Sequence, residues 1–159
     1  WLNSYSEYVE TLNEWWQENT GYDWRELRSR AMDIMNEESR LSQIVQLVGP
    51  NALPDEQRLI LETARLIKEG LMQQNALDGV DTFSSIQKQI KMLELILYFY
   101  QRAEKAVQLG VLASELHSLD VVNAIIHMKT EVINRNVIQL ENIRKQIDQE
   151  FSELEQQYV

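Results

Sequence analysis

Two prolines and a glycine divide an otherwise helix-favouring sequence, and this interruption constrains the fold more than any other feature. Gly49 and Pro50 end an apolar helical run, because glycine tolerates the left-handed conformation at a helix C-terminus and proline lacks the amide N–H that would continue the helix. Pro54 restarts a helix at its first position, with Asp55 and Glu56 in the opening turn, where negative charge suits the helix dipole. A turn this short predicts two antiparallel helices.

The rest of the chain carries further helical patterns, and no alternation typical of a β-strand persists. The helices that we expect cover 4–19, 23–48 with Asp23 as N-cap and Val48 in its apolar stripe, 54–72, 84–109 with Ser84 or Ser85 as N-cap, 111–127 as a shorter stretch, and 132–158 as a longer last helix. The segment MLELILYFY is expected in the core. The pattern predicts an all-α fold, an antiparallel helical bundle of about five to six helices in one domain spanning 1–159.

Composition excludes several classes of protein. The net charge of −10 argues against a nucleic-acid surface, because phosphate binding needs clustered Lys and Arg. The absence of cysteine excludes disulfides, a thiolate nucleophile and a cysteine-based zinc site. No apolar run approaches the length of about 18 residues that a membrane span needs. We therefore expect a folded helical domain that inserts into no bilayer and binds no nucleic acid.

The sequence also lacks the parts of a self-sufficient catalytic site. No GxxxxGK[ST] segment and no glycine-rich strand-to-helix turn is present, so this chain alone should not hydrolyse ATP. His117 and His127 are the only histidines, and neither has HExxH or Glu-x-x-His spacing. Glu37 and Glu38 are expected on a solvated helix face. We predict no catalytic residue and no metal ligand within the chain.

The phrase IVQLVGPNALPDEQRLIL, followed by LMQQNALDGVDTF, resembles the C-terminal helical domain of the catalytic A (alpha) subunit of archaeal-type and vacuolar-type rotary ATP synthases and ATPases. The similarity covers nearly the whole chain from WLNSYSEYVETLNEWW onward and is densest between Ile44 and Gly110. It implies that the chain is a fragment of a longer subunit whose nucleotide-binding domain lies upstream. A start at Trp1, without an initiator Met, fits that expectation.

The resemblance implies that one segment contributes a wall to the adenine pocket at the interface of the A and B subunits. This segment comprises Gln74, Asn75, Ala76 and Leu77. The family usually has Phe where Leu77 stands, and leucine keeps an apolar surface but lacks the π-face that stacks on a base. The alternative interpretation of the same residues, from motif spacing alone, is a polar helix exit with no role in binding.

The resemblance further implies that the hairpin turn meets the central stalk of the rotary complex. The residues of this turn are Asn51, Ala52, Leu53, Pro54, Asp55 and Glu56. A turn stiffened by two prolines would transmit a push with little loss to local unfolding. Without the resemblance, the turn is equally well interpreted as an ordinary connection between two helices.

In the resembled complex the parent subunit binds ATP or ADP with Mg, whereas this fragment is expected to hold no cofactor. The partners implied are the B subunit, the other A subunits of the hexamer and the central stalk subunits. The implied location is the cytoplasmic side of a membrane, in the peripheral part of a proton- or sodium-translocating complex that runs as synthase or hydrolase. The alternative is a free-standing acidic helical adaptor. Sequence upstream of Trp1 separates the two, since a P-loop there supports the first and an initiator Met the second.

Overall fold

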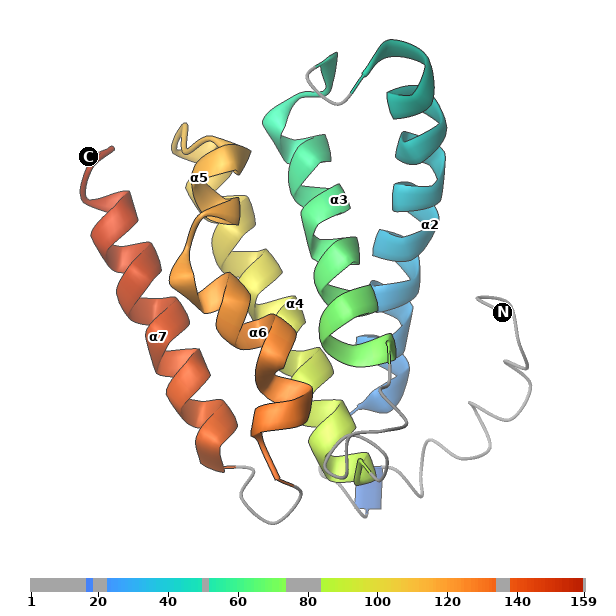
Figure 1. Cartoon of the computed structure of the whole chain (residues 1–159), viewed down its shortest axis with the longest axis vertical. Coiled ribbons are helices and arrows are strands. Elements are labelled where there is room, and N and C mark those ends of the chain that lie inside the picture. Colours follow the sequence, from blue (N-terminus) through green and yellow to red (C-terminus); the bar gives the residue numbers. More distant parts are fainter. Residues whose placement is uncertain (1–16, 19–22, 50–51, 74–83, 134–137, 159) are drawn as a thin grey trace.

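The structure is a computed structural model that describes residues 17–18, 23–49, 52–73, 84–133 and 138–158. From Asp23 onward these described residues form six α-helices and one short π-helix, and they contain no strand (Figure 1). Their bounds are α2 Trp24–Val48, α3 Asp55–Ile67, the π-helix η2 Lys68–Met72, α4 Ile86–Gln108, α5 Ala113–His117, α6 Asp120–Glu131 and α7 Ile138–Glu155. The predicted all-α bundle is confirmed. None of the described helices is long and apolar enough to cross a bilayer.

Helix α4 is the centre of the bundle. It contacts the α2–α3 hairpin on one side and α7 on the other, while α6 contacts both η2 and α7 (Figure 1). The segment MLELILYFY lies on α4, and its core prediction is confirmed. Its buried side chains are Met92, Leu93, Leu95, Ile96, Leu97 and Phe99. The Phe99 ring meets the Phe151 ring of α7 edge-to-face, with centroids 5.4 Å apart.

Helix boundaries that depend on local chemistry lie where the sequence predicts them. The Asp23 carboxylate accepts the Glu26 amide N–H at 3.2 Å and caps α2. Gly49 ends α2 with a φ of 84°, the left-handed conformation that favours glycine. Of the two serines that could cap α4, Ser85 does so by accepting the Lys88 amide N–H at 3.3 Å.

The helix predicted over 54–72 departs from α-helical geometry at its end. In η2 the Gln73 amide N–H donates to the Lys68 carbonyl at 2.8 Å, five residues back, which is the spacing of a π-helix. At Gly70, an added Cβ would stand 3.0 Å from the Ile125 carbonyl oxygen of α6. The backbones of η2 and α6 therefore approach closely at Gly70 and Ile125. The local sequence pattern could not predict this long-range contact.

Two other predicted helices have different bounds. The stretch predicted as one helix over 111–127 is divided between α5 and α6, because Leu119 adopts an extended conformation between them, and α6 continues past 127 to Glu131. The last helix does not begin at Val132, whose backbone leaves the helical region and whose side chain is buried in the core at 3% exposure. Within the described residues α7 begins at Ile138, and its predicted apolar positions Leu140, Ile147, Phe151 and Leu154 are buried as expected. The predicted helix 4–19 is described only at 17–18, which are helical.

Candidate functional site

The tip of the α2–α3 hairpin, defined as residues 47–56, is the first candidate site. Helix α2 runs unbroken for 25 residues from Trp24 to Val48 and is therefore roughly 37 Å long at 1.5 Å per residue. The hairpin tip lies at the end of α2 opposite to its start (Figure 1). Residues 50–51 of the hairpin tip, including the predicted contact residue Asn51, lie outside the described residues.

The remaining predicted contact residues of the hairpin tip differ in exposure. Ala52, Pro54 and Glu56 are exposed, as a contact surface requires. Leu53 is instead buried, with 8% of its surface exposed, so it offers little surface to a partner.

Asp55 also has a structural partner. Its Oδ1 accepts the Ala113 amide N–H at 2.9 Å and lies 3.6 Å from the Arg58 guanidinium. Ala113 is the first residue of α5, whose opening amides have no partner within that helix. Asp55 therefore ties the hairpin to α5, and its side chain is half-buried.

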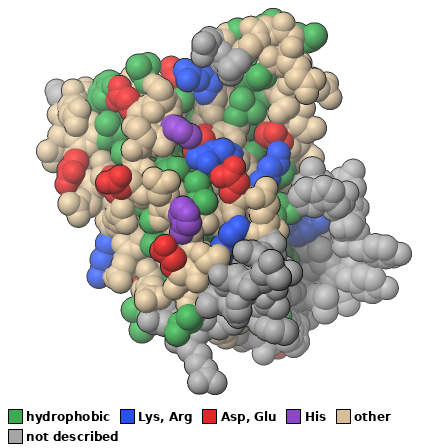
Figure 2. All heavy atoms as spheres, in the orientation of Figure 1, with side chains coloured by type: hydrophobic (Ala, Val, Ile, Leu, Met, Phe, Trp, Pro, Cys, Tyr) green, Lys and Arg blue, Asp and Glu red, His purple; other side chains and the backbone are tan. Residues whose placement is uncertain are grey.

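Sequence reasoning missed two exposed apolar residues of the hairpin tip. Leu47 is 85% exposed and Val48 is 60% exposed, so the assignment of Val48 to the buried stripe of α2 is wrong. An apolar stripe predicts which face of a helix packs against its neighbours. It does not predict how far along the helix those neighbours reach. Figure 2 shows hydrophobic side chains at the upper end of the molecule, beside the residues drawn in grey.

The second candidate site is the proposed adenine wall. Gln74, Asn75, Ala76 and Leu77 all lie outside the described residues, which resume at Ser84. The structure does describe how the preceding residue is held. The Lys129 ammonium of α6 donates to the Glu69 carbonyl at 2.6 Å and also to the Gln73 carbonyl. The chain thus leaves η2 at a point fixed by a side chain of α6.

Lys88 in turn binds the backbone of Lys129. The Lys88 side chain is fully buried, and its ammonium donates to the Lys129 carbonyl at 2.6 Å, near the C-terminus of α6. The last carbonyls of a helix lack intrahelical partners and carry the negative end of the dipole, so a cation is favourable there. These contacts join residues 41 and 60 positions apart, which explains why no local sequence signal revealed them.

The histidines have ordinary structural surroundings. Nδ1 of the exposed His117 lies 3.1 Å from the Glu62 carboxylate, and Nδ1 of His127 lies 2.8 Å from the Asn123 carbonyl of its own helix. Among the described residues, no group of three or more His, Asp or Glu side chains could hold a metal ion.

The two adjacent glutamates of α2 differ from each other. Glu37 pairs with Arg40 one turn later, and this hydrogen bond lowers the pKa of its exposed carboxyl. Glu38 is not simply solvated, because it receives the Lys68 ammonium at 2.9 Å and the Ser42 hydroxyl at 2.9 Å. Burial opposes its ionisation, but these hydrogen bonds outweigh that effect and lower the pKa of Glu38. Glu38 thereby links α2 to η2.

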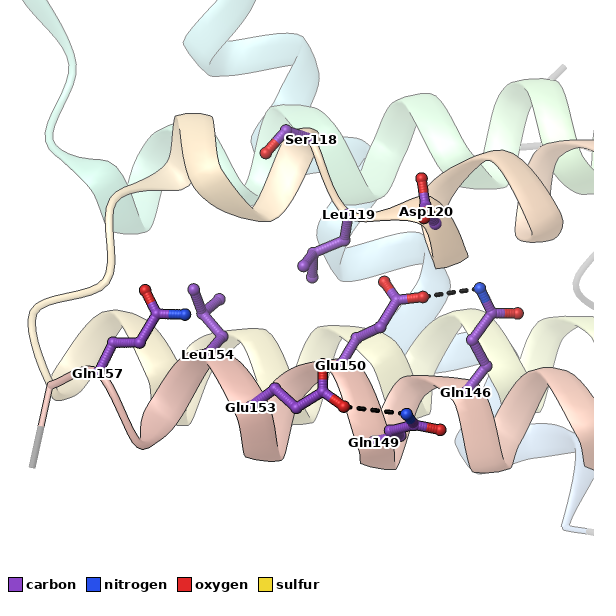
Figure 3. Close-up of a pocket in the computed structure, with 9 residues that line it drawn as sticks. All are labelled: Ser118, Leu119, Asp120, Gln146, Gln149, Glu150, Glu153, Leu154 and Gln157. Atoms are coloured by element: carbon purple, nitrogen blue, oxygen red, sulfur yellow. Dashed lines mark hydrogen bonds between the residues drawn. The ribbon is translucent and has the colours of Figure 1, made fainter.

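A polar groove of about 440 Å³ lies between the α5–α6 connection and α7 (Figure 3). Two of the carboxylates that line it, those of Glu150 and Glu153, have hydrogen-bond donors on the protein. Glu150 accepts from the Gln146 side chain at 2.7 Å and from the Val121 amide N–H at 3.1 Å, while Glu153 accepts from Gln149 at 2.9 Å. The Glu150 contact with Val121 joins α7 to the first turn of α6. These carboxylates have structural partners, and the arrangement indicates no acid/base pair.

Fold and site together define an all-α domain with a projecting α2–α3 hairpin. Residues 13–116 match the family described as the C-terminal domain of V and A type ATP synthase. The chain belongs to this family, as its sequence motifs predicted.

Relatives extend the similarity over almost the whole chain. It is 50% identical, over 97% of its length, to the A subunit of the A-type ATP synthase of Methanopyrus kandleri. It is 40% identical, over 99% of its length, to the alpha chain of the V-type ATP synthase of Halothermothrix orenii. It is 43% identical, over 96% of its length, to the A subunit of the A-type ATP synthase of Methanosphaera stadtmanae. The chain spans 26 to 27% of these relatives.

Proposed function

We propose that this domain couples nucleotide-driven motion of a catalytic A subunit to the central stalk of an ion-translocating rotary ATP synthase or ATPase. Family membership supports the proposal, and the α2–α3 hairpin is the observation that carries it. Helix α2 continues through Glu38 without a break, and Asp55 ties the turn to the first residue of α5. A push on the hairpin tip would therefore move the whole domain before it unfolded the hairpin.

We also propose that residues 74–77 lend one wall to an adenine pocket shared with the B subunit. The parent subunit would supply the phosphate and Mg contacts from its nucleotide-binding domain and would work within a hexamer of A and B subunits. The Lys129 contact supports this proposal, because it holds Gln73 immediately before the segment. The parent complex would lie at the cytoplasmic face of a membrane and translocate protons or sodium ions.

A site-specific cross-link tests the coupling role. The chain contains no cysteine, so Ala52→Cys, made in a complete A subunit freed of other cysteines, gives one attachment point for a benzophenone maleimide. Ala52 is exposed, so the change should not disturb folding. In the assembled complex, illumination should join the A subunit to one of the central stalk subunits and stop rotation.

Ser152→Cys is the matched control, because Ser152 is exposed on α7, away from the hairpin. It should leave rotation intact after illumination. The coupling role is wrong if the probe at position 52 gives no stalk product while the complex rotates normally.

A further inference from the structure

The hydrogen bonds of the π-helix η2 depend on a side chain of α6. In an α-helix the Gln73 amide N–H would donate to the Glu69 carbonyl, four residues back. In η2 it donates instead to the Lys68 carbonyl at 2.8 Å, five residues back. The Glu69 carbonyl accepts the Lys129 ammonium at 2.6 Å. Lys129 thus supplies to Glu69 the hydrogen bond that Gln73 would supply in an α-helix.

The same ammonium also holds the residue that follows η2. It donates to the Gln73 carbonyl, so one cation bridges two carbonyls that lie four residues apart in the sequence. A hydrogen bond from a charged donor is roughly twice as strong as one between neutral groups. In the α register the Gln73 amide would compete with this ammonium for the Glu69 carbonyl. Lys129 therefore favours the π register of η2 over the α register.

The backbone that carries Lys129 is itself held in place. The ammonium of the fully buried Lys88 donates to the Lys129 carbonyl at 2.6 Å. One helical turn earlier, the Ile125 carbonyl oxygen stands 3.0 Å from the position that a Cβ on Gly70 would take, so α6 and η2 approach each other at the backbone. Lys129 therefore reaches η2 from a tightly packed interface and not from a loosely attached surface.

The other end of η2 is held by a different helix. The Lys68 ammonium lies 2.9 Å from the Glu38 carboxylate of α2. The start of η2 is thus tied to α2, and the residue after its end, Gln73, is tied to α6 through Lys129. Single turns of π-helix are rare and are frequent at functional sites. This one ends immediately before residues 74–77, the segment proposed to form the adenine wall.

We infer that Lys129 is a positioning residue for the nucleotide site, because it selects the π register of η2 and thereby sets where the adenine wall begins. The inference rests on the proposed adenine wall of residues 74–77. Lys129 acts through Gln73 and not by contact with the nucleotide. Its replacement should therefore weaken only the part of nucleotide binding that depends on the base.

Steady-state ATP hydrolysis by the rotary complex, assembled with a complete A subunit, tests the inference. Lys129→Met removes the donor and should raise the KM for ATP about fivefold, a part of what one whole base contact contributes. The kcat should change by less than about twofold, because the base contact is the same in the ground state and the transition state. Lys129→Arg keeps a cationic donor and should retain most of the affinity. Lys145→Met is the matched control, because Lys145 is exposed on α7, and it should leave the KM unchanged.

A probe without a base separates positioning from folding. Inorganic tripolyphosphate carries a chain of three phosphates but neither base nor sugar. Its inhibition constant should be the same for the unmodified complex and for the Lys129→Met complex. A purely structural loss would lower the fraction of active complex and hence the kcat, without raising the KM for ATP.

Leu77→Ala, made in parallel, alters the proposed wall directly and separates the two proposals. If Leu77→Ala raises the KM for ATP and Lys129→Met does not, the positioning role is wrong and the adenine wall stands. If neither variant raises it, the adenine wall is rejected as well. A fall in kcat alone in Lys129→Met overturns the positioning role, and so does an equal rise in the KM for ATP and in the inhibition constant of tripolyphosphate.

Discussion

Lys129 connects chain segments that are distant in the sequence. Its ammonium donates hydrogen bonds to the carbonyls of Glu69 in η2 and of Gln73, the residue after η2. Its own carbonyl accepts a hydrogen bond from the buried Lys88 ammonium of α4. Two cations thus stand where two helices end, replacing amide donors that the helical backbone cannot supply. The Lys129 side chain of α6 therefore fixes the position of Gln73, where the chain leaves η2.

Replacing this lysine should destabilise the domain. Lys129→Met keeps most of the side-chain volume but leaves two carbonyls without their donor, so the free energy of unfolding should fall by about 1–3 kcal/mol. Urea titration of the chain measures this loss, and amide exchange in η2 should become faster. Lys145→Met is the control, because Lys145 is exposed on α7, and it should stay within about 0.5 kcal/mol. Equal stability of the two variants would show that the Lys129 contacts contribute nothing.

The α2–α3 hairpin is held by contacts of different kinds. Leu53 is buried beneath the turn, Asp55 binds the first amide of α5, and Glu38 of α2 pairs with Lys68 at the start of η2. None of these contacts is strong by itself, since an exposed or half-buried ion pair contributes only about 0–1 kcal/mol. They add to the apolar packing of α2 and α3 against α4, which holds the hairpin on the bundle.

Asp55 offers a direct test of this attachment. Asp55→Ala leaves the Ala113 amide without an acceptor and should cost about 1–2 kcal/mol, with faster exchange of that amide. Asp55→Asn keeps a carbonyl oxygen at the same position and should recover most of the protection. Glu56→Ala should cost only its helix-dipole interaction, about 0.3–1 kcal/mol, and leave the Ala113 amide protected. If Asp55→Asn exposes the amide as much as Asp55→Ala does, the negative charge is what matters at this position.

Features set within a few residues could be predicted from the sequence, and features set by packing could not. Asp23, Gly49 and Ser85 define helix ends through atoms at most four residues away, so their roles followed from residue type. The partner of Asp55 lies 58 positions away, and the shape of η2 depends on the backbone of α6. The sequence therefore located the hairpin tip correctly but did not show which of its residues face the solvent.

The whole molecule is organised around one continuous hydrophobic cluster to which every helix from α2 to α7 contributes. Polar contacts fix the outer helix on this core. Arg102 of α4 binds Asp148 at 2.8 Å and Glu155 at 3.2 Å, both on α7, and lies over the Phe151 ring at 5.6 Å from its centroid. A shared core of this kind predicts that the helices unfold together.

The isolated chain should therefore fold cooperatively and yet bind ATP very weakly. At best it offers one wall for adenine, and a base stack is worth only about 1–3 kcal/mol, less than the roughly 4.1 kcal/mol of even millimolar binding. Circular dichroism should show a mostly helical chain with a single cooperative melt, which establishes that the tested protein is folded. Titration calorimetry with ATP should then give no binding tighter than about 1 mM and no hydrolysis. Micromolar affinity in the folded chain would instead reveal a phosphate-binding site, because one adenine wall cannot supply that much free energy.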